Sequence, residues 1–441
     1  MYSLHGFEHD AAGDGGRLYT GSFGIYHVLC LCDVLLSGHS VSDPFAQSGS
    51  GIWEENFKLM KMRNCLLLLA VLAASVSCGP SYVEPVEASE AGFAVSLLKN
   101  VNAVTPKNEN VTVSPYSAAI ALSMLAEGAE GQTRVELDNA LGGVLYKAEN
   151  LGGNDTVTVK SANSVWIDDN FSPRDRYVSL LEKDFDAFLD VLNFADPATL
   201  RAINNWCSEN TGGKITEILD RLDPSNVMVL VNALYFNAPW EIPFDASLTE
   251  DQDFHGISKD SKVKMMSRKG TYLYAEANGF QIVQLPYSGR EYSMYVILPP
   301  EGSDMGKLLA KADAGMLSSA TEQLKMQEIR LFMPRFKVET SMLLNKPLQN
   351  MGIRTAFTSA ADFGGIAEMG PLVLDQVKQK CYVDGTENGT EAAAVTAVQI
   401  RLTSVRPPVK LPVMRVDRPF FYLIADNENK KVLFAGKIVN L

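Results

Sequence analysis

The chain has 441 residues, of which 46% are hydrophobic and 21% are charged, and its formal net charge is -13. This composition is typical of a globular protein with a large core, and the length allows one large domain or two to three smaller ones. The acidic balance argues against nucleic acid as a partner, because nonspecific phosphate binding needs patches of Lys and Arg.

The first predicted element is a signal peptide. Residues 60–78 read MKMRNCLLLLAVLAASVSC, in which Lys61 and Arg63 precede an apolar run that gives way to small residues and Cys78. The run is too short for a stable transmembrane helix, so the order predicts a secretory signal. Its ending is similar to a bacterial lipobox, which predicts that Cys78 is lipidated. The alternative is an ordinary signal cut near Ser77 that leaves Cys78 as a plain thiol.

This signal affects the interpretation of the segments on either side of it. Residues 1–59 are interpreted as upstream sequence outside the native protein, or as an unstructured segment, with Met60 or Met62 as the true start. Their Cys and His residues do not have the spacing of a closed zinc site. Residues 79–90 are polar and suit a tether. We therefore expect an exported, outer-membrane-anchored lipoprotein, periplasmic or extracellular, that meets the membrane only through its lipid.

Residues 91–441 contain no evident linker or repeat, which indicates one domain. Helical spacing of apolar residues marks three segments, 88–101, 114–129 and 199–213. Ser89 is placed to cap the first segment, a proline begins the second, and glycines end the third.

Strand-like runs dominate the second half of the chain. They are NVMVLVNALYFNAPW, FQIVQLPY, YSMYVILPP and EIRLFMPRFKVE, with turn signals between them. The end, RPFFYLIADNENKKVLFAGKIVNL, is typical of a β-hairpin around DNENK. Helices early and strands late predict an α+β fold with large antiparallel or mixed sheets.

Several kinds of chemistry lack the residues they need. His255 is the single histidine after residue 59, and it lies in a turn-like context without a nucleophile elbow, so we expect it at the surface. No phosphate-binding glycine loop is evident. Cys207 and Cys381 offer one pair rather than a disulfide framework and are expected to be buried free thiols. A catalytic site built on paired carboxylates is not excluded by the sequence, but no motif supports an enzyme. No cofactor or metal is expected.

The order of several motifs resembles the serpin family. NVTVSPYSAAIALSMLAEGAEGQT is similar to an early serpin helix, and LVNALYFNAPWEIPFD, VKMM, LPY, YSMYVILP and LFMPRFKVE follow in serpin order. ENGTEAAAVTA is similar to the loop hinge, and VDRPFFYLI with LFAGKIVN to the C-terminal signature. The resemblance covers about residues 88–441, and with the signal it is greatest to a bacterial exported serpin.

The resemblance implies three β-sheets, about eight or nine helices and an exposed reactive loop at about residues 387–410. It also implies suicide inhibition rather than enzyme activity. A serine protease, or alternatively a cysteine protease, attacks the loop and forms an acyl-enzyme. The cut loop then inserts as a new strand of the central sheet and distorts the protease. The target protease is the expected partner, and the inhibitor is expected to be a monomer.

The run 386–408, TENGTEAAAVTAVQIRLTSVRPP, suits a segment that is a loop in one state and a strand in another. Side chains alternate between the two faces of a strand. One face would be small or β-branched and fit for burial: Thr390, Ala392, Ala394, Thr396, Val398 and Ile400. No proline interrupts residues 386–406. Thr390 is predicted to be the first inward-facing residue to enter the sheet; the alternative is an ordinary alanine-rich loop.

Three groups of site residues carry over from the family. The hinge comprises Glu387, Gly389, Thr390, Glu391, Ala392, Ala393 and Ala394. The breach comprises Trp240, Arg335 and Glu387, where the charged pair would hold the top of the central sheet closed. The shutter, whose polar groups let strands slide apart, comprises Asn110, Ser114, Ser117, Asn232 and Gln379. Serpins usually have histidine near 379, so we expect altered rather than absent shutter function, because the Gln379 amide can bridge two neighbours.

The family's usual loop spacing, counted from Glu387, predicts cleavage at Thr403–Ser404 and elastase-like or broad specificity. Other bonds stay open: Arg401 or Arg406 would suit trypsin-like proteases, and Leu402 chymotrypsin-like ones. The main alternative function is a non-inhibitory serpin that acts as a carrier or chaperone. Charged or bulky residues on the inward face of 390–396 would indicate that alternative, and none is present.

Overall fold

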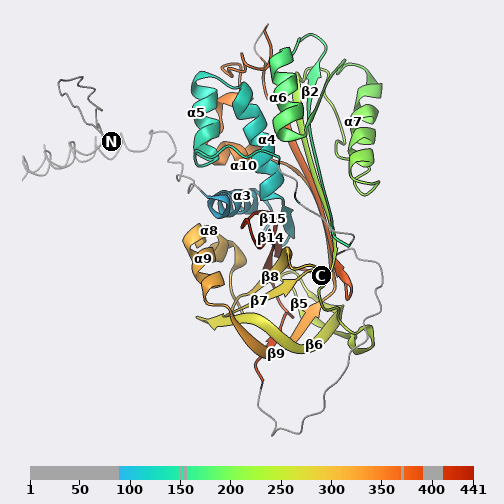
Figure 1. Cartoon of the computed structure of the whole chain (residues 1–441), viewed down its shortest axis with the longest axis vertical. Helices are drawn as coiled ribbons and strands as arrows, with labels where there is room; N and C mark the ends of the chain where they lie inside the picture. The colour runs from blue at the N-terminus through green and yellow to red at the C-terminus, as the bar shows by residue number, and fades with distance from the viewer. Residues whose placement is uncertain (1–88, 149–150, 152–155, 369–371, 391–410) are drawn as a thin grey trace, which may run out of the picture. The chain divides into compact units, whose positions relative to one another are not determined.

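Figure 1 shows the computed structural model of the chain, which describes residues 89–148, 151, 156–368, 372–390 and 411–441. The predicted upstream segment, the signal peptide with Cys78, and the tether up to residue 88 lie outside these ranges.

Eight α-helices lie within the described ranges, together with two short 3-10 helices. They are α3 (Glu90–Val104), α4 (Pro115–Gly128), α5 (Gly131–Ala140), α6 (Asp175–Phe185), α7 (Pro197–Asn210), α8 (Met305–Lys311), α9 (Ala314–Glu322), α10 (Asn345–Asn350), η2 (Ala246–Leu248) and η3 (Thr355–Phe357).

The starts of the first two helices follow from their sequence. The Ser89 hydroxyl accepts a hydrogen bond from the N–H of Gly92 at 2.9 Å, so α3 begins at its capping serine. Pro115 occupies the first turn of α4, where the missing N–H would have no partner within the helix. Ser114 caps α4 by accepting from the N–H of Ser117 at 3.2 Å. All three predicted helical segments are helices, within a few residues at each end.

A six-stranded sheet, here the central sheet, carries the candidate site. In spatial order its strands are β10 (Phe336–Leu343), β11 (Gln376–Gly385), β12 (Gly389–Thr390), β4 (Met228–Pro239), β2 (Thr158–Asp168) and β3 (Phe188–Leu192). β10 and β11 are antiparallel, as are β4 and β2. β11 and β4 are parallel to each other over residues 376–381 and 229–234, so the sheet is mixed, as predicted.

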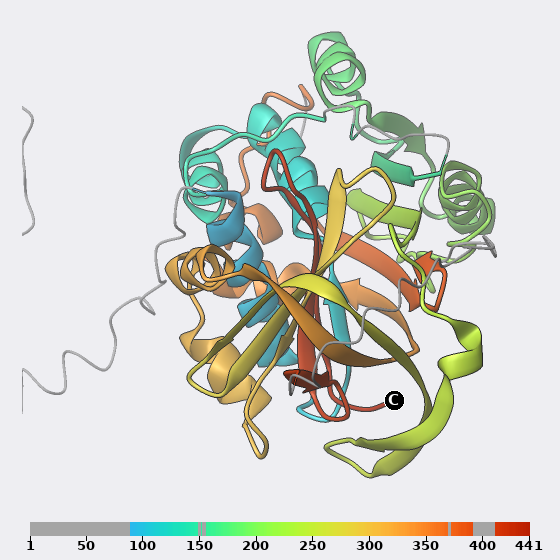
Figure 2. The ribbon, with the colours of Figure 1, turned by 60° about the horizontal axis from the view of Figure 1, so that its bottom comes forward.

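The remaining strands form a second hydrogen-bonded set of nine. In order they are β1 (Val111–Val113), β15 (Val432–Ile438), β14 (Phe420–Asp426), β8 (Tyr292–Leu298), β7 (Phe280–Pro286), β6 (Asp260–Ala277), β9 (Lys325–Pro334) and β13 (Val413–Arg415), with β5 (Glu250–His255) paired to β6. The long strand β6 curves away from its hairpin with β5 (Figure 2). The expected small third sheet, formed by β5, β13 and the adjoining parts of β6 and β9, is thus continuous with the second.

Two hydrophobic cores hold these layers together. The main core joins the two sheets with α3 and α4 and includes Leu97, Leu125 and Phe434. A second core packs α7 against the other face of the central sheet, with Ile203 of α7 near Trp166 of β2. Each fully buried large apolar side chain stabilises the fold by roughly 1.5–3 kcal/mol.

These elements confirm the predicted α+β class, with one boundary that the sequence did not show. The run 328–339 was predicted as one strand-like segment, but β9 ends at Pro334 and β10 begins at Phe336. β9 belongs to the second set of strands and β10 to the central sheet. Arg335 therefore lies where the chain crosses from one sheet to the other.

Candidate functional site

The central sheet divides at one end, here called the mouth, where β4 and β11 separate around β12. Thr390 of β12 pairs with Gly385 of β11 on one side and with Ala238 of β4 on the other. Both residues of β12 thus already occupy a strand position in the uncut chain. The sequence predicted that Thr390 would enter the sheet first; the structure places it there before any cleavage.

Only glycine fits at position 389. Its φ is +146°, which L side chains rarely adopt. A Cβ atom at this position would lie 2.2 Å from the carbonyl oxygen of Ala238 and 2.5 Å from the Cα of Pro239, both of them backbone atoms. The carbonyl of Gly389 also accepts from the N–H of Thr386 at 2.9 Å, which closes the turn before β12.

The side chain of Thr390 is fully buried in the mouth. Its Oγ1 lies 2.6 Å from the hydroxyl of Tyr287, and either oxygen can be the donor. Tyr287 follows β7 and is fully buried too. Burial raises the pKa of the Tyr287 hydroxyl far above its ordinary value, so it stays protonated and keeps its hydrogen for this bond.

The breach residues meet immediately before β12. The Glu387 carboxylate is nearly buried, and one of its oxygens lies 2.6 Å from the guanidinium Nη2 of Arg335. The same oxygen accepts from the hydroxyl of Thr249 at 2.7 Å. Burial alone would raise the pKa of Glu387, but the hydrogen bonds from Arg335 and Thr249 outweigh it and hold the pKa below its ordinary value.

Trp240 completes the breach from the end of β4. Its indole N–H donates to the carbonyl of Thr386, and its backbone N–H donates to that of Asn388, both at 2.8 Å. Its ring stacks on Tyr287 with centroids 4.6 Å apart and planes at 12°. The three predicted breach residues are therefore brought together around the start of the hinge.

The shutter is built around the amide of Gln379, which is almost fully buried in β11. Its Nε2 donates to the carbonyl of Ser114 at 3.0 Å and to Oδ1 of Asn232 at 2.9 Å. Its Oε1 accepts from the N–H of Ser114 at 2.9 Å. Asn232 in turn donates to the carbonyl of Ser117 at 2.8 Å. One amide thus joins α4, β4 and β11, and neutral imidazole could not make all three bonds because it has one donor and one acceptor.

Two predicted shutter residues behave differently, and one participant was missed. Asn110 lies outside this network: its amide accepts from the N–H of Val439 at 2.8 Å and so ties down the end of the chain. Ser117 contributes only backbone groups, since its buried Oγ has no partner among the described residues. Asn163 of β2 was not predicted, yet it accepts a hydrogen bond from Asn232. An asparagine in the stretch where β2 becomes buried was the available signal.

The rest of the predicted site lies outside the described residues. This applies to the hinge residues Glu391, Ala392, Ala393 and Ala394 and to the cleavage candidates Arg401, Leu402, Thr403, Ser404 and Arg406. Within the described ranges, no group of three or more His, Cys, Asp or Glu residues could hold a metal ion. No helix in those ranges is long and apolar enough to cross a membrane.

The histidine and the two cysteines of the described ranges lie where the sequence predicted them. His255 ends β5 at the surface, and its Nδ1 lies 3.2 Å from the carboxylate of Asp260. Cys207 and Cys381 are buried free thiols, as predicted. Burial raises the pKa of Cys207 to about 12, so this thiol stays protonated and is a poor nucleophile.

Comparison with known proteins adds an independent finding. A family model described as "Serpin (serine protease inhibitor)" matches residues 88–441. An uncharacterized serpin-like protein of Thermococcus kodakarensis is 32% identical over 347 residues, which cover 76% of this chain and 81% of that protein. The native state of a thermophilic serpin, tengpin, has a similar structure, with a TM-score of 0.75 and 28% identity over 82% of this chain and 97% of that one. Human thyroxine-binding globulin in complex with thyroxine gives a TM-score of 0.72 and 27% identity, over 80% and 97%.

Proposed function

Because this chain belongs to the serpin family, we propose that it is a suicide inhibitor of serine proteases, with cysteine proteases as the alternative class of target. The observation that carries the proposal is the position of Thr390, buried between β4 and β11 in the uncut chain. Because Gly389 and Thr390 already form a short strand between β4 and β11, a cut loop would extend this strand.

The proposed reaction starts at Thr403–Ser404. The protease nucleophile attacks the carbonyl carbon of Thr403, the peptide bond breaks, and Ser404 leaves with a free amine. The acyl-enzyme then either takes up water or is carried away by the inserting loop. Insertion beyond Thr390 requires β11 and β4 to part, so the Gln379–Asn232 hydrogen bond has to open.

Incubation with proteases of trypsin, chymotrypsin, elastase and papain type, followed by a denaturing gel, tests this proposal. Wild type should form a detergent-stable covalent complex with at least one of them. Thr390→Arg should instead be cut as a substrate, because an unpaired charge in the mouth opposes insertion. Thr390→Ser, which keeps a small hydroxyl, is the matched control and should still form the complex. Equal complex yield from Thr390→Arg would contradict insertion.

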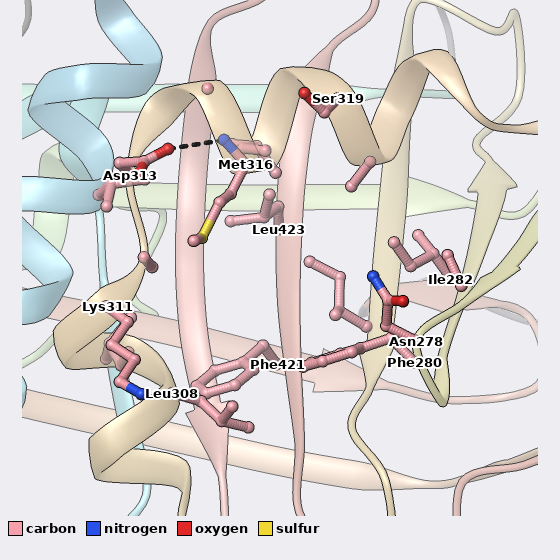
Figure 3. Close-up of a pocket in the computed structure, with 18 of the residues that line it drawn as sticks. Asn278, Phe280, Ile282, Leu308, Lys311, Asp313, Met316, Ser319, Phe421 and Leu423 are labelled. Atoms are coloured by element: carbon pink, nitrogen blue, oxygen red, sulfur yellow. Dashed lines mark hydrogen bonds between the residues drawn. The ribbon is translucent and has the colours of Figure 1, made fainter.

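A second candidate function, a carrier of a small apolar molecule, is favoured by one cavity. The cavity measures about 670 Å³ and lies between α3, α8, α9 and the sheet strands β7 and β14. Met316 of α9 and Leu423 of β14 point toward one another across it, with Ile282 and Phe280 of β7 to one side (Figure 3). Its size and apolar lining suit a small-molecule ligand, and the similar thyroxine-binding globulin is a complex with thyroxine.

Binding of a fluorescent fatty-acid analogue tests the carrier function. The analogue should bind wild type, and Ala320→Trp, which fills part of the cavity from α9, should weaken binding at least tenfold. Equal binding by both proteins, or none by wild type, would remove this candidate. The two functions are separable, because Ala320 lies in α9, which contributes no residue to the mouth.

Export is proposed on the sequence alone. Cys78 would be the lipidated first residue of the mature chain, and the lipid its only contact with the membrane. Expression in a Gram-negative host with labelled fatty acid should label wild type and leave Cys78→Ala unlabelled. Equal labelling of the two proteins would exclude this anchor, and light scattering of the labelled protein in detergent should report a monomer.

A further inference from the structure

One contact at the mouth is separate from the breach ion pair. The hydroxyls of Tyr287 and Thr390 lie 2.6 Å apart, and both side chains are fully buried. Thr390 belongs to the segment that moves during insertion. Tyr287 is fixed beside the second set of strands, where its N–H donates to the carbonyl of Tyr292 at 2.9 Å. This hydrogen bond therefore joins a moving element to a static one.

Tyr287 has little freedom to follow the hinge. Its ring stacks on Trp240 at 4.6 Å and meets the ring of Phe236 edge-on at 5.0 Å. If Thr390 left the mouth, its own hydroxyl would reach water, but the hydroxyl of Tyr287, whose ring is held by stacking, would lose the partner that it has among the described residues. Leaving a buried donor unsatisfied costs more than the bond itself contributes, so the pair favours an occupied mouth.

We propose that Tyr287 is a positioning residue that holds Thr390 in the mouth and so sets the point from which loop insertion starts. The inference rests on the proposed inhibitory function. After cleavage, insertion competes with hydrolysis of the acyl-enzyme. When Thr390 is already in the mouth, insertion begins with the next inward-facing residue of the loop. When the mouth is empty, Thr390 has to enter first, and this additional step gives hydrolysis of the acyl-enzyme more time.

Substitution of each partner separates this role from simple packing. Tyr287→Phe keeps the stacked ring but leaves the Thr390 hydroxyl unpaired when it is buried, so the hinge should leave the mouth more often. In Tyr287→Phe with Thr390→Val both partners are apolar and of similar shape, a change that can be nearly neutral. The double variant should therefore recover what the single Tyr287→Phe variant loses.

Two measurements report the effect in the full chain. Amide hydrogen exchange over residues 386–390, followed by mass spectrometry, should be at least about fivefold faster in Tyr287→Phe. The number of inhibitor molecules consumed per protease blocked should rise about three- to tenfold. Both values should return toward wild type in the double variant.

Tyr422→Phe is the matched control. The Tyr422 hydroxyl lies 2.7 Å from Thr112 Oγ1, and both side chains are buried, but among the described residues this pair makes no hydrogen bond to residues 386–390. It should leave both readouts unchanged. Wild-type values in Tyr287→Phe, an equal effect in Tyr422→Phe, or no recovery in the double variant would each overturn the inference. If wild type inhibits no protease, the proposed function fails, and the exchange measurement alone still decides whether Tyr287 holds Thr390.

Discussion

The guanidinium of Arg335 lies 2.6 Å from the carboxylate of Glu387, and this contact ties the hinge to both sheets. Arg335 stands between β9 and β10, where the chain passes from the second set of strands into the central sheet. Glu387 lies two residues before β12 and also accepts from Thr249.

Replacing Arg335 by Met should lower the free energy of unfolding by about 1–3 kcal/mol at pH 7, because a nearly buried carboxylate loses its charged partner. The pKa of Glu387 is lower in the folded protein than in the unfolded chain, where it is near 4.5. The stabilisation that Glu387 provides is therefore complete above the unfolded-state pKa and is lost as the pH falls through the folded-state pKa. Urea unfolding at pH 7 and at about pH 3 should therefore show a difference between wild type and variant that shrinks on acidification.

Lys262→Met is the control for this prediction. The ion pair of Lys262 with Asp253 is exposed on both sides, so its loss should leave the free energy of unfolding close to that of wild type. An Arg335→Met deficit that is the same at both pH values would show that the ion pair is not its cause.

Replacing Gln379 by His should make the protein acid-sensitive. A neutral imidazole can still accept from the N–H of Ser114, but an imidazolium cannot, so burial here would depress the folded pKa of the histidine. The free energy of unfolding of the variant would be highest above the unfolded-state histidine pKa of about 6.5 and would decrease as the pH drops below that pKa. Between pH 8 and pH 5 the variant's Tm should fall by about 1–4 °C more than that of wild type. Parallel Tm curves would contradict a close contact between residue 379 and Ser114.

Gly389→Ala should exclude the hinge from the mouth, since the new Cβ would overlap the backbone of Ala238 and Pro239. Amide exchange over residues 386–390 should accelerate, and more of the protein should be cut as substrate. Gly213→Ala is the control: Gly213 also has a positive φ, +77°, but nothing lies within 4 Å of the added atom. It should cost stability of about 1 kcal/mol without changing exchange at the hinge. Slow exchange in Gly389→Ala would mean that β12 tolerates a side chain.

Apolar periodicity and helix caps are local signals, and they predicted the α+β class and the main helices. The breach residues were predicted only by the resemblance to serpins. The sequence did not predict which polar residues meet across elements. Asn110 and Asn163 illustrate this limit: both are asparagines near apolar runs, yet one binds the chain end and the other joins the shutter. The partner of Thr390 was also hidden, because Tyr287 is 103 residues away in the chain and packs beside the mouth against Trp240 and Phe236 of another strand region.

Thermal unfolding before and after a single cut at Thr403–Ser404 tests the central claim most directly. If the freed segment continues from Thr390 as a full strand, it gains roughly ten ladder hydrogen bonds at about 1 kcal/mol each, which should raise the Tm by about 10 °C or more. A Tm that stays the same or falls after the cut would show that the loop remains outside the central sheet and would contradict suicide inhibition by strand insertion.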